Sequence, residues 1–126
     1  MITEKILTPS QAEKENDNGL RDMVNHIADQ LTNGFGEDLS EGRDIENEGE
    51  FSAYDYLSDV LDINWILNND RTYKGARVLV AFGGPNIWID TNLGQVEGYW
   101  WGDSFIKSFS DNVGLDDALE DLFNCQ

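Results

Sequence analysis

The sequence predicts an α+β fold: an antiparallel β-meander of about four strands with two N-terminal helices and one C-terminal helix. Residues 20–31 and 115–123 carry apolar side chains at helical spacing, whereas residues 63–101 consist of short apolar runs separated by Gly and Asn. The length of 126 residues is typical of a single domain. We therefore expect one domain over residues 1–126, with its helices against one face of the sheet.

The clearest predicted helix covers residues 20–31, where apolar side chains recur every third or fourth position. Asp17 or Asn18 can cap its start, and Gly34 can supply the left-handed residue that ends it. The preceding residues, 1–16, are mostly polar and are expected to form a lead-in strand or a loose arm.

A second helix is predicted at about residues 53–61. Ser52 followed by Asp55 resembles a capping box, although Asp replaces the usual Glu or Gln. Asp55, Asp59 and Asp62 then recur at i, i+4 and i+7, which would align them along one helix face at a cost of a few tenths of a kcal/mol per like-charged pair.

The strands are predicted from alternation and turn residues. Residues 63–67 could extend the second helix or begin a strand, and we favour a strand. Further strands are predicted at 76–82, 86–91 and 95–101, and alternation over 105–109 suggests a short edge strand. Gly98 interrupts the fourth strand, where a bulge or a close backbone approach is expected.

The charge of the chain limits its partners. It has 25 acidic and 8 basic residues, a net charge of -17, and its 40% hydrophobic content is too high for a disordered acidic tail. A folded body with this charge disfavours direct binding to DNA, RNA or an anionic membrane. The natural complement is a protein whose basic surface normally holds nucleic acid.

Cysteine content and hydropathy favour a host-cell cytoplasmic setting. The single cysteine, Cys125, has no partner within the chain, so no internal disulfide can form. The first residues contain no apolar run suited to a signal peptide, and no stretch approaches the ~20 apolar residues of a membrane span.

Ten carboxylates between residues 37 and 62 are candidates for a partner-binding face. The plain alternative is a solvated surface that keeps a small protein soluble. Duplex DNA carries one charge per ~1.7 Å of axis, so a continuous acidic face could occupy a phosphate-binding groove. The ten are Glu37, Asp38, Glu41, Asp44, Glu46, Glu48, Glu50, Asp55, Asp59 and Asp62.

An aromatic hairpin provides a second candidate surface. Trp100 and Trp101 must point to opposite faces if both lie in a strand, and Trp88, Tyr99 and Trp101 could share one face. Core packing is the ordinary explanation for such side chains. An exposed aromatic row would instead bind a partner or a second copy of the chain, and Trp88 and Trp101 are its candidate anchors.

The sequence contains no catalytic signature that we would assign. Asp90, Glu97 and Asp103 invite comparison with paired-carboxylate glycosidases, but a meander of this size offers little room for a sugar. The only histidine, His26, borders the apolar stripe of the first helix, and no Ser or Cys nucleophile is marked. No run has the order of an EF-hand or a phosphate loop. We therefore expect no enzymatic activity, no catalytic residue, no cofactor and no metal.

The segments Gly75–Thr91 and Gly98–Asp103 resemble small accessory proteins of phages and conjugative elements of Gram-positive bacteria, over roughly residues 54–125. In size and acidity the chain is also similar to anti-restriction and anti-CRISPR proteins that mimic nucleic acid, without an aligned motif that would carry over functional residues. The resemblance implies a counter-defence inhibitor of a CRISPR effector or restriction nuclease. An immunity protein or antitoxin against a basic nuclease toxin is the alternative, and a small enzyme or structural accessory protein is a third.

Overall fold

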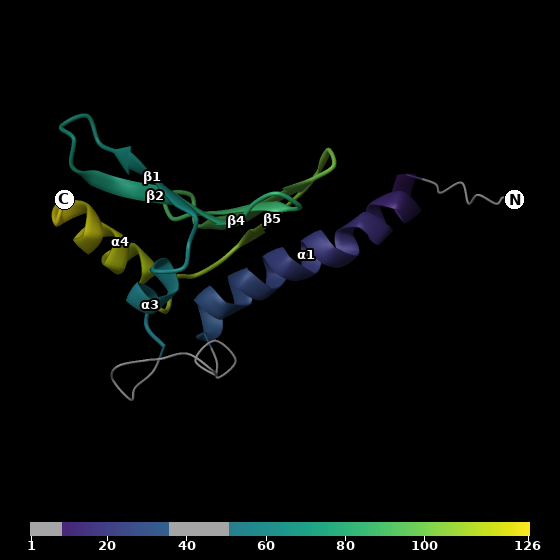
Figure 1. Ribbon diagram of the computed structural model, residues 1–126, viewed down its shortest axis with the longest axis horizontal. Helices are drawn as coiled ribbons and strands as arrows, with labels where there is room; N and C mark the ends of the chain where they lie inside the picture. The colour runs from purple at the N-terminus through teal and green to yellow at the C-terminus, as the bar shows by residue number, and fades with distance from the viewer. Residues whose placement is uncertain (1–8, 36–50) are drawn as a thin grey trace, which may run out of the picture.

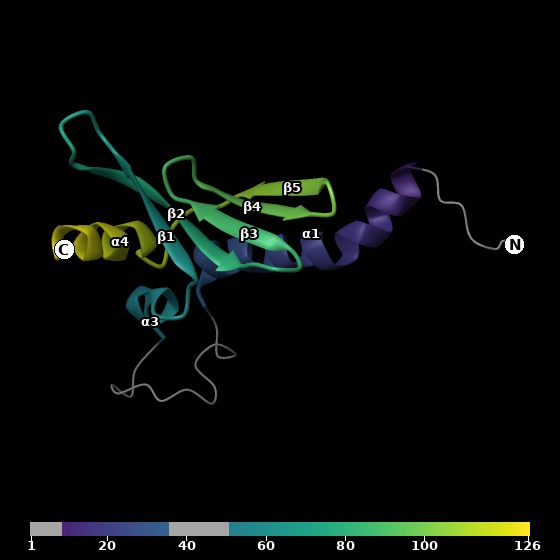
Figure 2. The same cartoon turned by 45° about the horizontal axis from the view of Figure 1, so that its top comes forward.

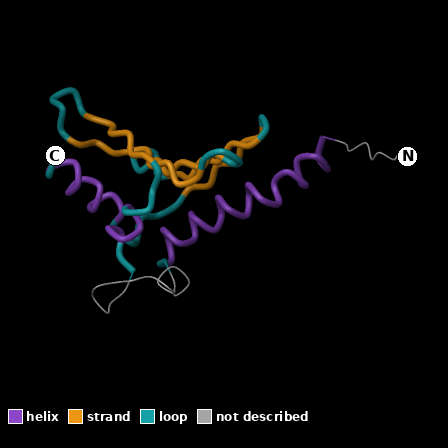
Figure 3. Tube along the Cα trace, in the orientation of Figure 1, coloured by secondary structure: helices purple, strands orange, loops and turns teal. Residues whose placement is uncertain are grey.

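The computed structural model describes residues 9–35 and 51–126, and side chains from residue 19 onward. It confirms the α+β class, with helices before and after the sheet (Figure 3). In chain order the elements are α1 (Pro9–Asn33), α3 (Ala53–Leu57), β1 (Asp62–Leu67), β2 (Tyr73–Ala81), β3 (Asn86–Asp90), β4 (Gln95–Trp100), β5 (Asp103–Ser108) and α4 (Leu115–Asn124).

The five strands form one antiparallel sheet in the order β1-β2-β3-β4-β5, so each strand pairs with its neighbour in sequence (Figure 2). The sequence predicted about four strands, one fewer than the structure has. The additional strand is β5, which the alternation near 105–109 suggested and which pairs with β4 from Gln95↔Ser108 to Trp100↔Asp103. The strand favoured at 63–67 is confirmed as β1.

Helices α1 and α4 lie on the same face of the sheet, α1 beneath β4 and β5, and α4 beneath β2 (Figure 1). The core is the layer between them. Its fully buried large side chains are Leu20, Val24, Leu31, Val78, Ile87, Ile89, Val96, Leu115 and Leu119. Within the described part of the chain, no helix covers the opposite face, which we call the open face.

Helix α1 is longer than the sequence suggested. It begins at Pro9, so residues 9–16 are helical and the expectation of a strand or loose arm there was wrong. Proline is tolerated in a first turn because its missing N–H would have no helical partner. The end is as predicted: Gly34 follows with a φ of 111°, and its N–H donates to the Gln30 carbonyl at 2.9 Å.

Helix α3 begins as predicted and ends early. The Ser52 N–H donates to Asp55 Oδ2 at 2.8 Å and the Asp55 N–H donates to Ser52 Oγ at 3.2 Å, which completes the capping box. The helix stops at Leu57 because the Leu61 N–H already bonds the Leu79 carbonyl of β2 at 2.8 Å. The expected helix to residue 61 was therefore wrong.

Gly98 allows α1 to approach β4. A Cβ at this position would lie 2.6 Å from Val24 Cγ2 and 2.7 Å from Leu20 Cδ1. The register of β4 is regular on both sides, so the close approach is confirmed and no bulge is present.

Replacing Gly98 with Ala should destabilise the fold by about 1–3 kcal/mol, because the added methyl overpacks the α1–β4 contact. Chemical denaturation measures the change. Gly84→Ala is the matched control, since a Cβ there meets nothing within 4 Å. Equal stability of the two variants would contradict the proposed packing constraint.

Candidate macromolecular interface

The open face carries a polar cluster built by strand register. Arg77 on β2 pairs with Asp90 on β3, and Trp88 on β3 pairs with Glu97 on β4. Because paired residues point to the same side of a sheet, these four side chains share the open face. Asp90 is 4% exposed and Glu97 is 5% exposed, so two carboxylates are buried on a face that no described helix covers.

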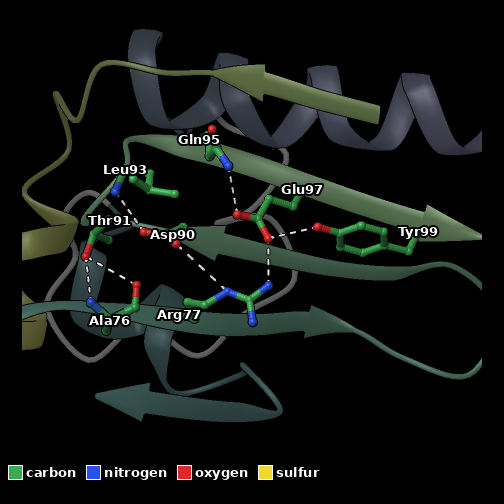
Figure 4. A network of polar contacts seen from close by, with 8 residues as sticks. All are labelled: Ala76, Arg77, Asp90, Thr91, Leu93, Gln95, Glu97 and Tyr99. Atoms are coloured by element: carbon green, nitrogen blue, oxygen red, sulfur yellow. Dashed lines mark hydrogen bonds and ion pairs between the residues drawn. The ribbon is translucent and has the colours of Figure 1, made fainter. Parts of the chain in front are cut away.

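One arginine holds both carboxylates (Figure 4). Arg77 Nη2 donates to Glu97 Oε1 at 2.6 Å, and its Nε lies 3.9 Å from Asp90 Oδ2. The guanidinium also lies over the Trp88 ring, 4.5 Å from its centroid. Arg77 therefore reaches across β3 to β4. All the partners of its guanidinium named here are side chains of the sheet.

Glu97 receives two further hydrogen bonds, from Gln95 Nε2 at 2.9 Å and from the Tyr99 hydroxyl at 3.1 Å. Burial is the largest single influence on its pKa and acts to raise it. The hydrogen bonds from Gln95 and Arg77, the charge of Arg77 and the bond from Tyr99 together outweigh burial and hold the pKa of Glu97 below its ordinary value. The carboxylate is therefore ionised at neutral pH.

The lowered pKa of Glu97 does not suit the general acid of a paired-carboxylate glycosidase, which needs a raised pKa. Asp90 accepts from the Leu93 N–H at 2.8 Å and so stabilises the β3–β4 turn, while Glu97 is engaged by Arg77. Asp103 pairs with Trp100, which places it on the helix-covered face. Among the side chains that the structure describes, those of residues 19–35 and 51–126, no group of three or more His, Cys, Asp or Glu could hold a metal ion.

Replacing Arg77 with Met should destabilise the protein by about 2–3 kcal/mol at neutral pH. This is less than for a fully buried pair, because the Arg77 side chain is 34% exposed. The stability that Glu97 contributes through its lowered pKa is present above its ordinary value of 4.5 and is lost as pH falls through the folded-state pKa. The difference between wild type and Arg77→Met should therefore shrink below about pH 4.5.

Urea denaturation over a pH series tests this, with Lys74→Met as the control, since Lys74 is an exposed cation on the same strand. A deficit that does not change with pH would place the contribution of Arg77 in its packing on Trp88.

Helix α4 carries four carboxylates, and α3 packs beside it (Figure 1). The Tyr54 hydroxyl of α3 donates to Asp121 Oδ2 at 2.7 Å and so ties the two helices together. The Tyr73 hydroxyl donates to Asp116 Oδ1 at 2.6 Å. The pKa of Tyr73 is raised, first by burial and second by this hydrogen bond. We call the carboxylates of this helix, Asp116, Asp117, Glu120 and Asp121, the α4 acidic face.

Sequence reasoning missed the α4 acidic face, although its signal was present. Carboxylates at 116, 117, 120 and 121 follow helical spacing, and buried Leu115, Ala118 and Leu119 direct them away from the core.

Three of the ten predicted carboxylates, Asp55, Asp59 and Asp62, do not form the stripe that was expected along one helix face. Asp55 caps α3, Asp59 lies in the turn after it, and Asp62 is the first residue of β1. Only Asp55 is helical, because α3 ends at Leu57. The other seven, Glu37, Asp38, Glu41, Asp44, Glu46, Glu48 and Glu50, lie outside the described residues.

The two aromatic anchor candidates lie in different environments. Trp88 is partly buried on the open face beneath Arg77. Trp101 is 84% exposed in the two-residue turn between β4 and β5, so it does not belong to a strand row with Trp88 and Tyr99. Trp100 points to the helix face, where a Cβ on Gly19 would lie 3.0 Å from its ring.

The chain matches no protein-family model, no curated protein and no solved structure. Among the residues described, no helix is long and apolar enough to cross a membrane.

Proposed function

We propose that this protein binds the basic nucleic-acid-binding surface of another protein and occludes it, as a counter-defence inhibitor of a CRISPR effector or restriction nuclease. The observation that carries the proposal is the charge density of the α4 acidic face. Asp116 and Asp121 are five helical steps apart, about 7.5 Å, and this length holds four carboxylates. Duplex DNA carries about four charges over the same length, at one per ~1.7 Å.

The stability of α4 alone does not account for this arrangement. The pairs 116/120 and 117/121 place like charges at i, i+4, which is unfavourable. Asp121 also lies in the last turn, where the helix dipole disfavours anions, and this turn contains no basic residue. A basic partner would compensate these costs.

The counter-defence setting rests on the sequence's resemblance to small acidic anti-restriction and anti-CRISPR proteins. The polar cluster on the open face is consistent with a binding protein, since its one arginine is engaged by carboxylates and adds no basic patch. With a net charge of -17, electrostatic steering would speed encounter with a basic partner.

Purified protein should inhibit DNA cleavage by a restriction endonuclease or a CRISPR effector complex in competition with DNA, without binding DNA in a gel-shift assay. The complex should weaken progressively as salt rises, because added ions screen the attraction. Capture of a toxin nuclease encoded beside this gene, with no effect on the defence enzymes, would favour the immunity-protein alternative.

Reversing Asp117 and Glu120 to Lys should slow association by about tenfold, because both exposed carboxylates lie on the α4 acidic face. Stopped-flow or surface-plasmon-resonance measurement gives the rate. The matched control, Asp22→Lys with Asp29→Lys on α1, changes the net charge equally and should slow association less. Equal slowing by the two variants would mean that net charge, and not this face, determines binding.

The double variant Glu46→Lys with Glu48→Lys tests the acidic stretch outside the described residues in the same way, by its effect on the association rate. Binding that ignores salt and all these substitutions would refute nucleic-acid mimicry.

A further inference from the structure

The sheet has two edge strands, β1 and β5, and they differ in how far they are protected against pairing with another strand. Each has a neighbouring strand on one side only. An edge strand presents unpaired backbone N–H and C=O groups, and proteins commonly block such an edge with a charge, a proline or a bulge.

The β1 edge carries two of these protections. Asp62 Oδ1 accepts a hydrogen bond from the Ile63 N–H at 2.9 Å, so a carboxylate occupies a backbone donor of this strand. The pairing of β1 with β2 also shifts in register between Ile66 and Leu67. An incoming strand would therefore meet a negative charge and an irregular backbone.

The β5 edge has neither protection. Its register with β4 is regular over its whole length, and the strand contains no proline. The Phe109 N–H, just beyond β5, donates to the Gly94 carbonyl at 3.1 Å. Because backbone bonding alternates along an antiparallel strand, the backbone groups of the even-numbered residues of β5 point away from β4. These residues are Ser104, Ile106 and Ser108, and all three are exposed.

The space beside this edge is open. Helix α1 packs beneath β4 and β5, on the helix-covered face (Figure 1). A cleft of about 600 Å³ lies between α1 and the C-terminal end of β5, and its lining includes Asp29, Lys107 and Ser108. Within the described part of the chain, no second strand pairs with β5 on its outer side.

The charge of β5 favours a second copy of the chain as the occupant of its edge. The strand contains one acidic and one basic residue, Asp103 and Lys107, so it has no formal net charge in a chain whose net charge is -17. Two such chains repel each other least where their local charge is lowest. A basic partner is disfavoured at this edge, because Lys107 is exposed on it and Arg21 lies over the Phe105 ring at 4.9 Å.

We propose that two copies of this protein pair antiparallel through β5 and so join their sheets across a two-fold axis. With the axis at Ile106, each Ile106 lies opposite its counterpart, Ser104 lies opposite Ser108, and Phe105 lies opposite Lys107. This register pairs the outward backbone groups of both strands and places no like charges opposite each other. It also covers Ile106, which is 49% exposed in the single chain. An isologous contact of this kind closes at two copies.

Sedimentation velocity over a concentration series, at low and at high salt, tests for the dimer. We expect a monomer–dimer equilibrium whose dimer fraction rises with salt, because added ions screen the repulsion between two acidic chains. The complex with a basic partner is expected to weaken with salt. The assay contains no partner protein, so failure of this proposal is distinguishable from failure of the proposed function.

Hydrogen–deuterium exchange on the unmodified protein locates the interface. The amides of Ser104, Ile106 and Ser108 should exchange more slowly as protein concentration rises, whereas the amide of Trp65 on β1 should be unaffected. Slow exchange at β5 that does not depend on concentration would mean that another part of the same chain covers the edge, and would overturn the proposal.

Ile106→Lys should weaken the dimer at least about tenfold, because it removes an apolar pair and sets two cations opposite each other at the axis. Leu61→Lys is the matched control: Leu61 is 59% exposed beside the start of β1, and the change in charge is the same. Both variants make the chain less acidic, so general repulsion cannot explain a loss confined to Ile106→Lys. A chain that is monomeric at every concentration and salt, or a dimer that Ile106→Lys leaves intact, would contradict pairing through β5.

Discussion

The close approach of α1 to the sheet at Gly98 is the constraint on which the rest of the structure depends. Leu20 and Val24 fill the space that a side chain on β4 would occupy, and both are fully buried there. This seats α1 beneath β4 and β5, while α4 packs beneath β2. Apolar burial is thereby concentrated on one face, and the opposite face must be completed by the side chains of its own strands.

On the open face, charged side chains of the strands complete the surface. Burying a carboxylate is costly unless it is paired and hydrogen-bonded, and Glu97 receives bonds from Arg77, Gln95 and Tyr99. The stem and guanidinium of Arg77 also cover Trp88, which would otherwise present its ring to water. Because Arg77 is paired with Glu97 and Asp90, one positive charge faces two carboxylates and the cluster is net negative.

The α4 acidic face and the exposed Trp101 lie at opposite ends of the sheet, with α3 and α4 at one end and the β4–β5 turn at the other (Figures 1 and 2). Their physical properties differ. Carboxylates act over about a Debye length and are screened by salt, whereas stacking on Trp101 requires contact and is less sensitive to salt.

The sequence by itself determined the class of fold, the strand that begins near residue 63, the capping box at Ser52 and the end of α1 before Gly34. These follow from local rules, because alternation, capping and left-handed turns depend on neighbours in the chain. It also contained the acidic spacing of α4, whose carboxylates recur at helical intervals.

Only the tertiary structure decided where α3 ends, because pairing of Leu61 with β2 competes with helical spacing that looks continuous to residue 61. It likewise decided that Arg77 reaches across β3 to Glu97, since residues 20 apart meet only through strand register. The position of Trp101 in a turn depended on where β4 and β5 begin to pair, and alternation alone does not encode that boundary.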